Sequence, residues 1–131
     1  MAASLDEISG AWTVREYRLA NGDVHVARGL LLLTDGHWAT LFFVLNPDGV
    51  PRLGSGQGGT FTLAGGTLTL THVAHVAAGA PIPGAPKADA DVLRHAPPDE
   101  PRVEICNVQV DGRVLHLHLP SGNIVTFDRA R

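Results

Sequence analysis

Four glycine-containing dipeptides divide the sequence where tight turns would join neighbouring strands: Asn21-Gly22, Asp35-Gly36, Gly65-Gly66 and Asp111-Gly112. Such dipeptides accept the positive φ angles that short β-hairpin turns require. Between them lie short runs of β-favouring residues without helical periodicity. The sequence therefore predicts antiparallel strands in which each strand pairs with the next one along the chain.

We expect eight strands, at about residues 11–20, 23–33, 37–43, 59–64, 67–76, 102–110, 113–119 and 123–129. A short N-terminal helical turn precedes them, because Ser4 and Glu7 have the spacing of a capping box. An eight-stranded meander leaves two exposed edges unless it closes on itself. The predicted fold is therefore all-β, an eight-stranded antiparallel up-and-down barrel, and a two-sheet sandwich is the alternative.

The connections differ between the two ends of this barrel. The turns at 35–36, 65–66 and 111–112 belong to one end, whereas the loops at about 44–58 and 77–101 belong to the other. The loop 77–101 is rich in Ala and Pro, with a helical turn expected at 88–93, and we expect it to be a lid rather than a disordered segment. The glycine run at 54–59 lacks the Lys-Ser/Thr ending of a phosphate-binding loop and is expected to form a flexible rim.

The length, net charge and cysteine count of the chain limit the class of protein to which it can belong. The 131 residues fit one domain, 1–131, and a net charge of −3 without any Lys/Arg run argues against nucleic acid or an anionic membrane as a partner. The acidic N-terminus and the lack of a long apolar stretch predict a cytoplasmic protein, monomeric or homodimeric. Cys106 has no second cysteine to pair with and is expected to be a buried apolar residue rather than a nucleophile.

A family resemblance rests on residues 8–43. Gly10-Ala11-Trp12 follows the helical turn, the second hairpin reads Gly29 through Thr34-Asp35-Gly36, and an arginine lies in the last strand. This pattern resembles the lipocalins and the wider calycin superfamily, and looks most like the bacterial and fungal lipocalin-like domains. The resemblance implies that Trp12 plugs the tight end of the barrel and packs against Arg129, with Arg131 as a substitute. The chain differs from secreted lipocalins, which have paired cysteines and a long first loop.

Candidate catalytic residues follow from the direction of the first strand. If Trp12 points inward, a period of two places Val14, Glu16 and Arg18 inward, and pairing across Asn21-Gly22 adds His25. The three ionisable side chains would then converge near the open end. The opposite face of this strand is more apolar, so a solvent-exposed ion pair is the alternative.

The remaining strands supply an apolar interior. His72 lies on the apolar side of its strand, where it is a candidate general base or a buried histidine satisfied by one hydrogen bond. His116 and His118 share a strand face, but the default for them is solvent exposure, and no metal site is expected. The predicted ligand-binding residues are Val14, Leu31, Leu33, Trp38, Thr40, Phe42, Phe61, Leu70, Cys106 and Leu117.

Two functions fit this sequence. In the first, the barrel holds a small, largely apolar molecule and catalyses a cofactor-free, non-redox step on it, such as an isomerisation or cyclisation in a biosynthetic route, assisted by Glu16 or His72. In the second, it binds or carries a small hydrophobic ligand without converting it. The sequence contains neither a nucleophile elbow nor a dinucleotide fingerprint, so hydrolase and nicotinamide chemistry lack support.

Overall fold

The structure is a computed structural model that describes residues 2–85, 92–95 and 100–130. In this part of the chain, one helical turn precedes nine strands. The elements are α1 (Leu5–Ile8), β1 (Gly10–Arg18), β2 (Val24–Thr34), β3 (His37–Leu45), β4 (Pro51–Ala64), β5 (Thr67–Gly79), β6 (Val92–His95), β7 (Arg102–Asp111), β8 (Val114–His118) and β9 (Ile124–Arg129).

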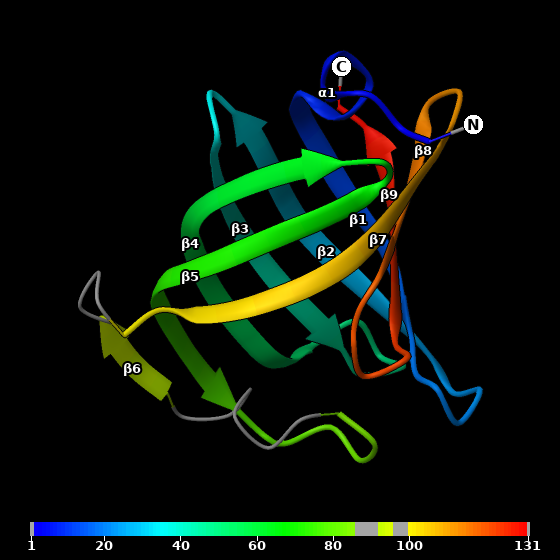
Figure 1. Cartoon of the computed structure of the whole chain (residues 1–131). Helices are drawn as coiled ribbons and strands as arrows, with labels where there is room; N and C mark the ends of the chain where they lie inside the picture. Colours follow the sequence, from blue (N-terminus) through cyan, green and yellow to red (C-terminus); the bar gives the residue numbers. More distant parts are fainter. Residues whose placement is uncertain (1, 86–91, 96–99, 131) are drawn as a thin grey trace.

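Eight of these strands form a closed antiparallel barrel (Figure 1). The order around the barrel is β4-β3-β2-β1-β9-β8-β7-β5, and pairing between β4 and β5 closes it. β6 lies outside the eight and pairs with residues 74–77 of β5, beyond the part of β5 that pairs with β7. The prediction of an all-β, eight-stranded barrel is confirmed, and the sandwich alternative is excluded.

The turns at 35–36 and 65–66 lie where the sequence predicted them, whereas the first and the last of the four predicted turns are shifted. The first turn joins Leu19 to Asp23, so it contains three residues, 20–22, rather than the two of Asn21-Gly22. Asp35 and Gly36 have φ angles of 49° and 72°, which a two-residue hairpin turn of this type requires. In the β7–β8 hairpin Asp111 pairs with Val114, so the turn is Gly112-Arg113 rather than Asp111-Gly112. The facing residues shift by two positions, which leaves every side chain on its predicted side of the sheet.

The loop predicted at 44–58 is wrong, as is the flexible glycine rim within it. β3 continues to Leu45 and β4 begins at Pro51, so only residues 46–50 connect the two strands. Glycine has a low intrinsic preference for strands, but β4 is hydrogen-bonded to a neighbour on both sides, and this pairing outweighs the preference. The glycines also allow close contact: a Cβ on Gly59 would lie 1.8 Å from the Thr71 carbonyl oxygen.

The lid predicted at 77–101 is described only in part. β5 continues to Gly79, and Val92–His95 forms strand β6, so the C-terminal part of the helical turn predicted at 88–93 is wrong. The buried side chain of Ile82 belongs to the hydrophobic core, which places the start of this segment against the barrel. Residues 86–91 and 96–99 of the predicted lid lie outside the described residues.

The closed end of the barrel has the arrangement that the family resemblance implied. Trp12 is fully buried, and its Nε1 donates to the Ile8 carbonyl at 2.8 Å. The Arg129 guanidinium lies 3.9 Å from the centroid of the indole ring and donates to the Ser9 carbonyl at 2.6 Å. α1 begins with the predicted capping box between Ser4 and Glu7. Arg131 lies outside the described residues.

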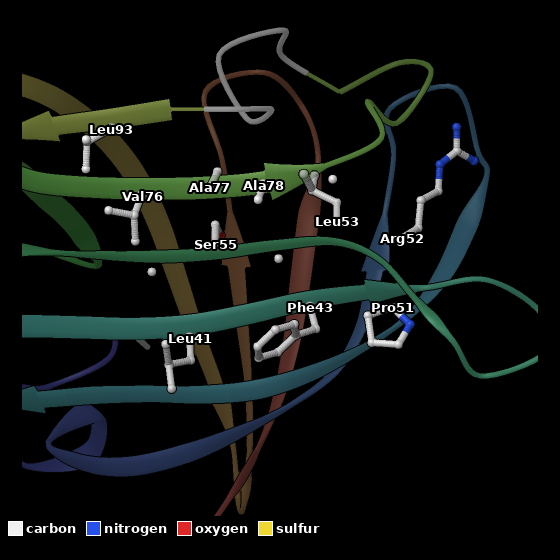
Figure 2. A pocket seen from close by; sticks show the side chains of 13 residues that line it. Leu41, Phe43, Pro51, Arg52, Leu53, Ser55, Val76, Ala77, Ala78 and Leu93 are labelled. Atoms are coloured by element: carbon white, nitrogen blue, oxygen red, sulfur yellow. The ribbon is translucent and has the colours of Figure 1, made fainter.

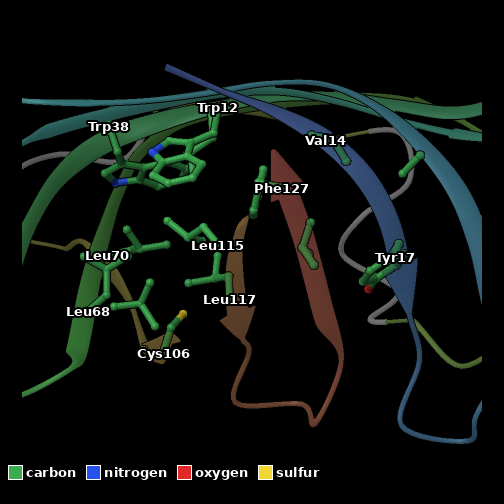
Figure 3. Close-up of a cluster of buried hydrophobic side chains, with 14 of the residues drawn as sticks. Trp12, Val14, Tyr17, Trp38, Leu68, Leu70, Cys106, Leu115, Leu117 and Phe127 are labelled. Atoms are coloured by element: carbon green, nitrogen blue, oxygen red, sulfur yellow. The ribbon is translucent and has the colours of Figure 1, made fainter. Parts of the chain in front are cut away.

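Large apolar side chains fill the interior next to this end, where Trp12, Leu115 and Phe127 pack together (Figure 3). The free space inside the barrel therefore lies toward its opposite, open end. Among the described residues, no helix has the length and apolar character needed to span a membrane.

Candidate functional site

An extra residue in β1 changes which side chains point inward. The pairing of β1 with β9 shifts register between Val14 and Glu16, so Arg15 is the additional residue of a β-bulge. Trp12 and Val14 point inward before the bulge, and Tyr17 points inward after it.

The prediction that Glu16 and Arg18 face the interior is therefore wrong. Both lie on the side of β1 opposite to the buried Tyr17, where Arg18 Nη2 approaches Glu16 Oε2 at 3.7 Å. Their side chains are 32% and 51% exposed, respectively, as expected for the alternative of a solvent-exposed ion pair. His25 pairs with Tyr17 and lies on the inner side of β2, but it does not line the cavity described next.

A cavity of about 350 Å³ occupies the open half of the barrel. Seven of the predicted site residues line it: Leu31, Trp38, Thr40, Phe42, Leu70, His72 and Leu117. The other predicted ligand-binding residues are buried in the core without lining the cavity: Val14, Leu33, Phe61 and Cys106. Pro120 and Ser121, in the β8–β9 connection, complete the wall at the open end.

The wall of this cavity is divided by polarity. Aromatic and aliphatic side chains come mainly from β1, β2, β3, β8 and β9, and include Tyr17, Leu31, Trp38, Phe42, Leu117, Val125 and Phe127. The polar side chains come mainly from β4, β5 and β7, and include Ser55, Gln57, His72, Arg102 and Glu104. The cavity can therefore hold a molecule that is apolar along one side and polar along the other.

A histidine and a carboxylate form the centre of the polar side. His72 Nε2 lies 2.9 Å from Glu104 Oε1, and His72 is only 5% exposed. The Trp38 ring meets the His72 ring edge-on, with ring centroids 4.8 Å apart. Gly59 of β4 pairs with both Trp38 and His72, so the absence of a side chain at this position lets rings on β3 and β5 meet across β4.

Charge favours the ionised form of Glu104. Burial raises the pKa of this carboxyl, but the hydrogen bond and charge of His72, together with the charge of Arg102, lower it more, so the pKa lies below its ordinary value. The carboxylate accepts a hydrogen bond, which assigns His72 Nε2 as the donor. His72 Nδ1 is buried and has no hydrogen-bond partner in the described part of the chain.

His75 is a second buried histidine on the same strand. A bulge at Val73 lets His72 and His75 both point inward, and His75 is 2% exposed. Both of its ring nitrogens lack a partner among the described residues. Burial, reinforced by the positive charge of Arg102, lowers the pKa of His75 below its ordinary value and favours the neutral ring.

Tyr17 is held in place from the open end. Asn123 Nδ2 donates to the Tyr17 hydroxyl at 2.8 Å, while Asn123 Oδ1 accepts from the Ala20 backbone N–H at 2.9 Å. The Tyr17 ring also packs edge-on against Phe42, with ring centroids 5.4 Å apart. These contacts fix the aromatic side of the cavity to the two turns that border its entrance.

Sequence reasoning missed several of these residues for different reasons. The period of two that starts at Trp12 leaves Tyr17 on the outer face because it does not include the bulge, and Gln57 lies in the loop predicted at 44–58. Arg102 and Glu104 share the period-two face of Cys106, which was correctly predicted to be buried, so extending that face by four residues would have found them.

A second hollow, of about 580 Å³, lies outside the barrel against β3, β4 and β5 (Figure 2). It forms because Gly54 and Gly56 have no side chains, and Leu41, Phe43 and Val76 border it. Arg52 is the one charged residue among its described lining residues. The interior cavity, with its paired histidine and carboxylate, is therefore the stronger candidate for chemistry.

The histidines on β8 do not form part of either hollow. His116 Nδ1 lies 3.2 Å from Thr126 Oγ1, and the described residues include no cluster of three or more metal-ligating side chains.

The barrel is similar to the crystal structure of a lipocalin-like protein from Bacteroides uniformis. The TM-score is 0.56, and the sequences are 16% identical over 95% of this chain and 99% of the other. The fold is lipocalin-like. A biogenic amine-binding protein is also similar, with a TM-score of 0.51 and 16% identity over 98% of this chain and 67% of the other. No protein-family model and no curated protein matches the sequence.

Proposed function

We propose that this lipocalin-like barrel binds a small, largely apolar molecule in its interior cavity. The observation that carries the proposal is the cavity itself, which has about 350 Å³ of free space between an aromatic wall and a polar wall. This volume lies within the roughly 300–1,000 Å³ range of small-molecule sites. A similar fold in a biogenic amine-binding protein supports a small-molecule partner.

Binding is tested with an uncharged fluorescent probe, N-phenyl-1-naphthylamine. We expect the probe to brighten on binding and to quench Trp38, which lines the cavity, because an apolar probe gains by leaving water. Ser55→Trp fills the cavity from β4 and should abolish binding, whereas Thr62→Trp on the exposed face of the same strand should not. Equal binding by both variants, with circular dichroism showing both folded, would contradict the proposal.

The His72–Glu104 pair favours a second candidate function, cofactor-free acid–base catalysis of an isomerisation or cyclisation. A carboxylate that accepts from one ring nitrogen orients the imidazole and stabilises the cation that forms when the ring takes up a proton. His72 is then the group that moves the proton, and Glu104 is a positioning residue. The role first considered for Glu16 does not fit its place on the outer surface.

Proton movement can be measured before the product is known. A ligand that passes the binding test is incubated with the protein in deuterated water, and exchange of its C–H protons is followed by NMR. Catalysis predicts exchange by the natural protein and its loss in His72→Ala and Glu104→Gln, with binding retained in both. Recovery of the ligand unchanged and unexchanged would leave binding without conversion as the function.

A further inference from the structure

We propose that the molecule bound in the cavity carries a carboxylate, which is held by Arg102 at the open end while the apolar part lies deeper in the barrel. This inference rests on the proposed binding function and adds the chemical class of the ligand. It depends on the position of Arg102, on its lack of a hydrogen-bond or ion-pair partner in the described part of the chain, and on the charges beside it.

Arg102 is the first residue of β7, and the turn that ends β7 belongs to the closed end of the barrel. Arg102 therefore lies at the open end. It shares the inward face of β7 with Glu104 and Cys106, lines the cavity, and is half-buried. Its guanidinium group is thus placed where the polar end of an entering molecule would stop.

The guanidinium of Arg102 makes no hydrogen bond or ion pair with any other residue in the described part of the chain. Other arginines are engaged: Arg15 pairs with Asp128, and Arg129 donates to backbone carbonyls at the closed end. A half-buried guanidinium carries five N–H donors in a fixed plane, and it is stabilised most by an anion that accepts two of them. Arg102 therefore offers an anion a set of guanidinium donors inside the cavity.

The neighbouring charges favour an anion over a cation. Of the residues lining the cavity, Arg102 and Glu104 are the two with permanently charged side chains at neutral pH. Glu104 already accepts a hydrogen bond from His72, whereas Arg102 has no hydrogen-bond or ion-pair partner among the residues that the structure describes. An ammonium group would compete with His72 for Glu104 and would be repelled by Arg102. A carboxylate is repelled by Glu104, but the hydrogen bond from His72 offsets part of the Glu104 charge. The carboxylate is attracted by Arg102, and its planar shape matches the guanidinium fork.

The distribution of side chains also sets the orientation of this ligand. Arg102 pairs in register with His72, and Trp38 contacts His72 from the other side. A carboxylate at Arg102 therefore lies beside the His72–Glu104 pair, and the adjoining carbons enter the region lined by Phe42 and Leu117. Such a ligand is an organic acid with an aliphatic or aromatic body.

The test uses three probes with the same apolar body: 4-phenylbutyrate, 4-phenylbutanol and 4-phenylbutylamine. Isothermal titration calorimetry at neutral pH measures their affinities for the natural protein, Arg102→Gln and Arg18→Gln. Arg18 is the matched control because it lies near the same end of the barrel, on the outer surface. Arg102→Gln should fold normally, since Arg102 makes no described contact that the fold depends on.

We expect the acid to bind the natural protein about tenfold to a hundredfold more tightly than the alcohol, and the amine to bind most weakly. Arg102→Gln should remove the preference for the acid without weakening the alcohol, and Arg18→Gln should change neither. Equal affinity for acid and alcohol, a preference for the amine, or an unchanged preference in Arg102→Gln would each overturn the proposal. Those outcomes leave cavity binding intact, whereas failure of the uncharged naphthylamine probe to bind would reject the proposed function itself.

Discussion

One residue, Arg15, decides which side chains of β1 point into the barrel. Without a bulge, the alternation that begins at Trp12 would bring Glu16 and Arg18 into the barrel; with it, Tyr17 takes the inward position. Nothing local in the sequence marks the extra residue, because a bulge is defined by pairing with the neighbouring strands. The greater apolar character of the opposite face was the one signal, and it indicated the observed orientation.

At the same scale, Cys106 illustrates a prediction that needed only the pattern. Burial raises the pKa of its thiol to about 12, and the nearby Glu104 charge contributes in the same direction. Because the thiolate is the reactive form, we expect iodoacetamide to leave the folded protein unmodified near neutral pH. After unfolding in concentrated guanidinium chloride, mass spectrometry should show complete modification. Rapid labelling of the folded protein would contradict the burial of this thiol.

Among the elements, β4 differs most from its prediction. Its glycine run carries little of the β-branched and aromatic character by which strands are recognised, and pairing with both neighbours holds it extended. The consequence reaches the site, because Gln57 and Ser55 of β4 line the cavity and Gly59 allows Trp38 to meet His72. The hairpins with tight dipeptide turns, by contrast, were predictable because the turn residues and the residue pairs that face each other beside the turn lie within a few positions of one another in the sequence.

The glycines of β4 are expected to differ in their tolerance of a side chain. A Cβ at position 59 would lie 1.8 Å from the Thr71 carbonyl oxygen, which only a backbone shift could relieve. At position 56 the nearest atom, Val76 Cγ2, is 3.4 Å away, an ordinary contact. Gly59→Ala should lower the free energy of unfolding by about 2 kcal/mol or more, and Gly56→Ala should change it by no more than about 0.5 kcal/mol. Urea denaturation measures both, and equal effects would contradict the close approach of β4 and β5.

For the whole molecule, a feature could be predicted from the sequence when the residues that determine it lie close together in the chain. The barrel, its closed end and most of its lining residues depend on alternation and turns, which are local. The arrangement of polar and aromatic side chains in the cavity depends on contacts between residues far apart in sequence, such as His72 with Glu104 and Tyr17 with Asn123. Burial of ionisable groups in such an arrangement couples the stability of the entire fold to pH.

His75 should dominate this coupling just below neutral pH. The pKa of His75 is lowered in the folded protein, so below its ordinary value near 6.5 the unfolded chain binds a proton that the folded chain does not. The free energy of unfolding should therefore fall as pH decreases from about 7.5 to about 5.5. Glu104 acts at lower pH: its lowered pKa adds stability that is lost only below its ordinary value of 4.5.

Urea denaturation at these two pH values checks the prediction with His75→Leu and a control, His95→Leu, at an exposed position on β6. The midpoint for the natural protein and for the control should decrease on acidification, while His75→Leu should lose much less stability over the same interval. An identical decrease in all three proteins would assign the pH dependence to another group. His75 lies beside the polar side of the cavity, so we expect its protonation and the loss of the cavity's shape to occur together. A ligand that binds the folded protein with a neutral His75 should therefore stabilise the fold against acid unfolding.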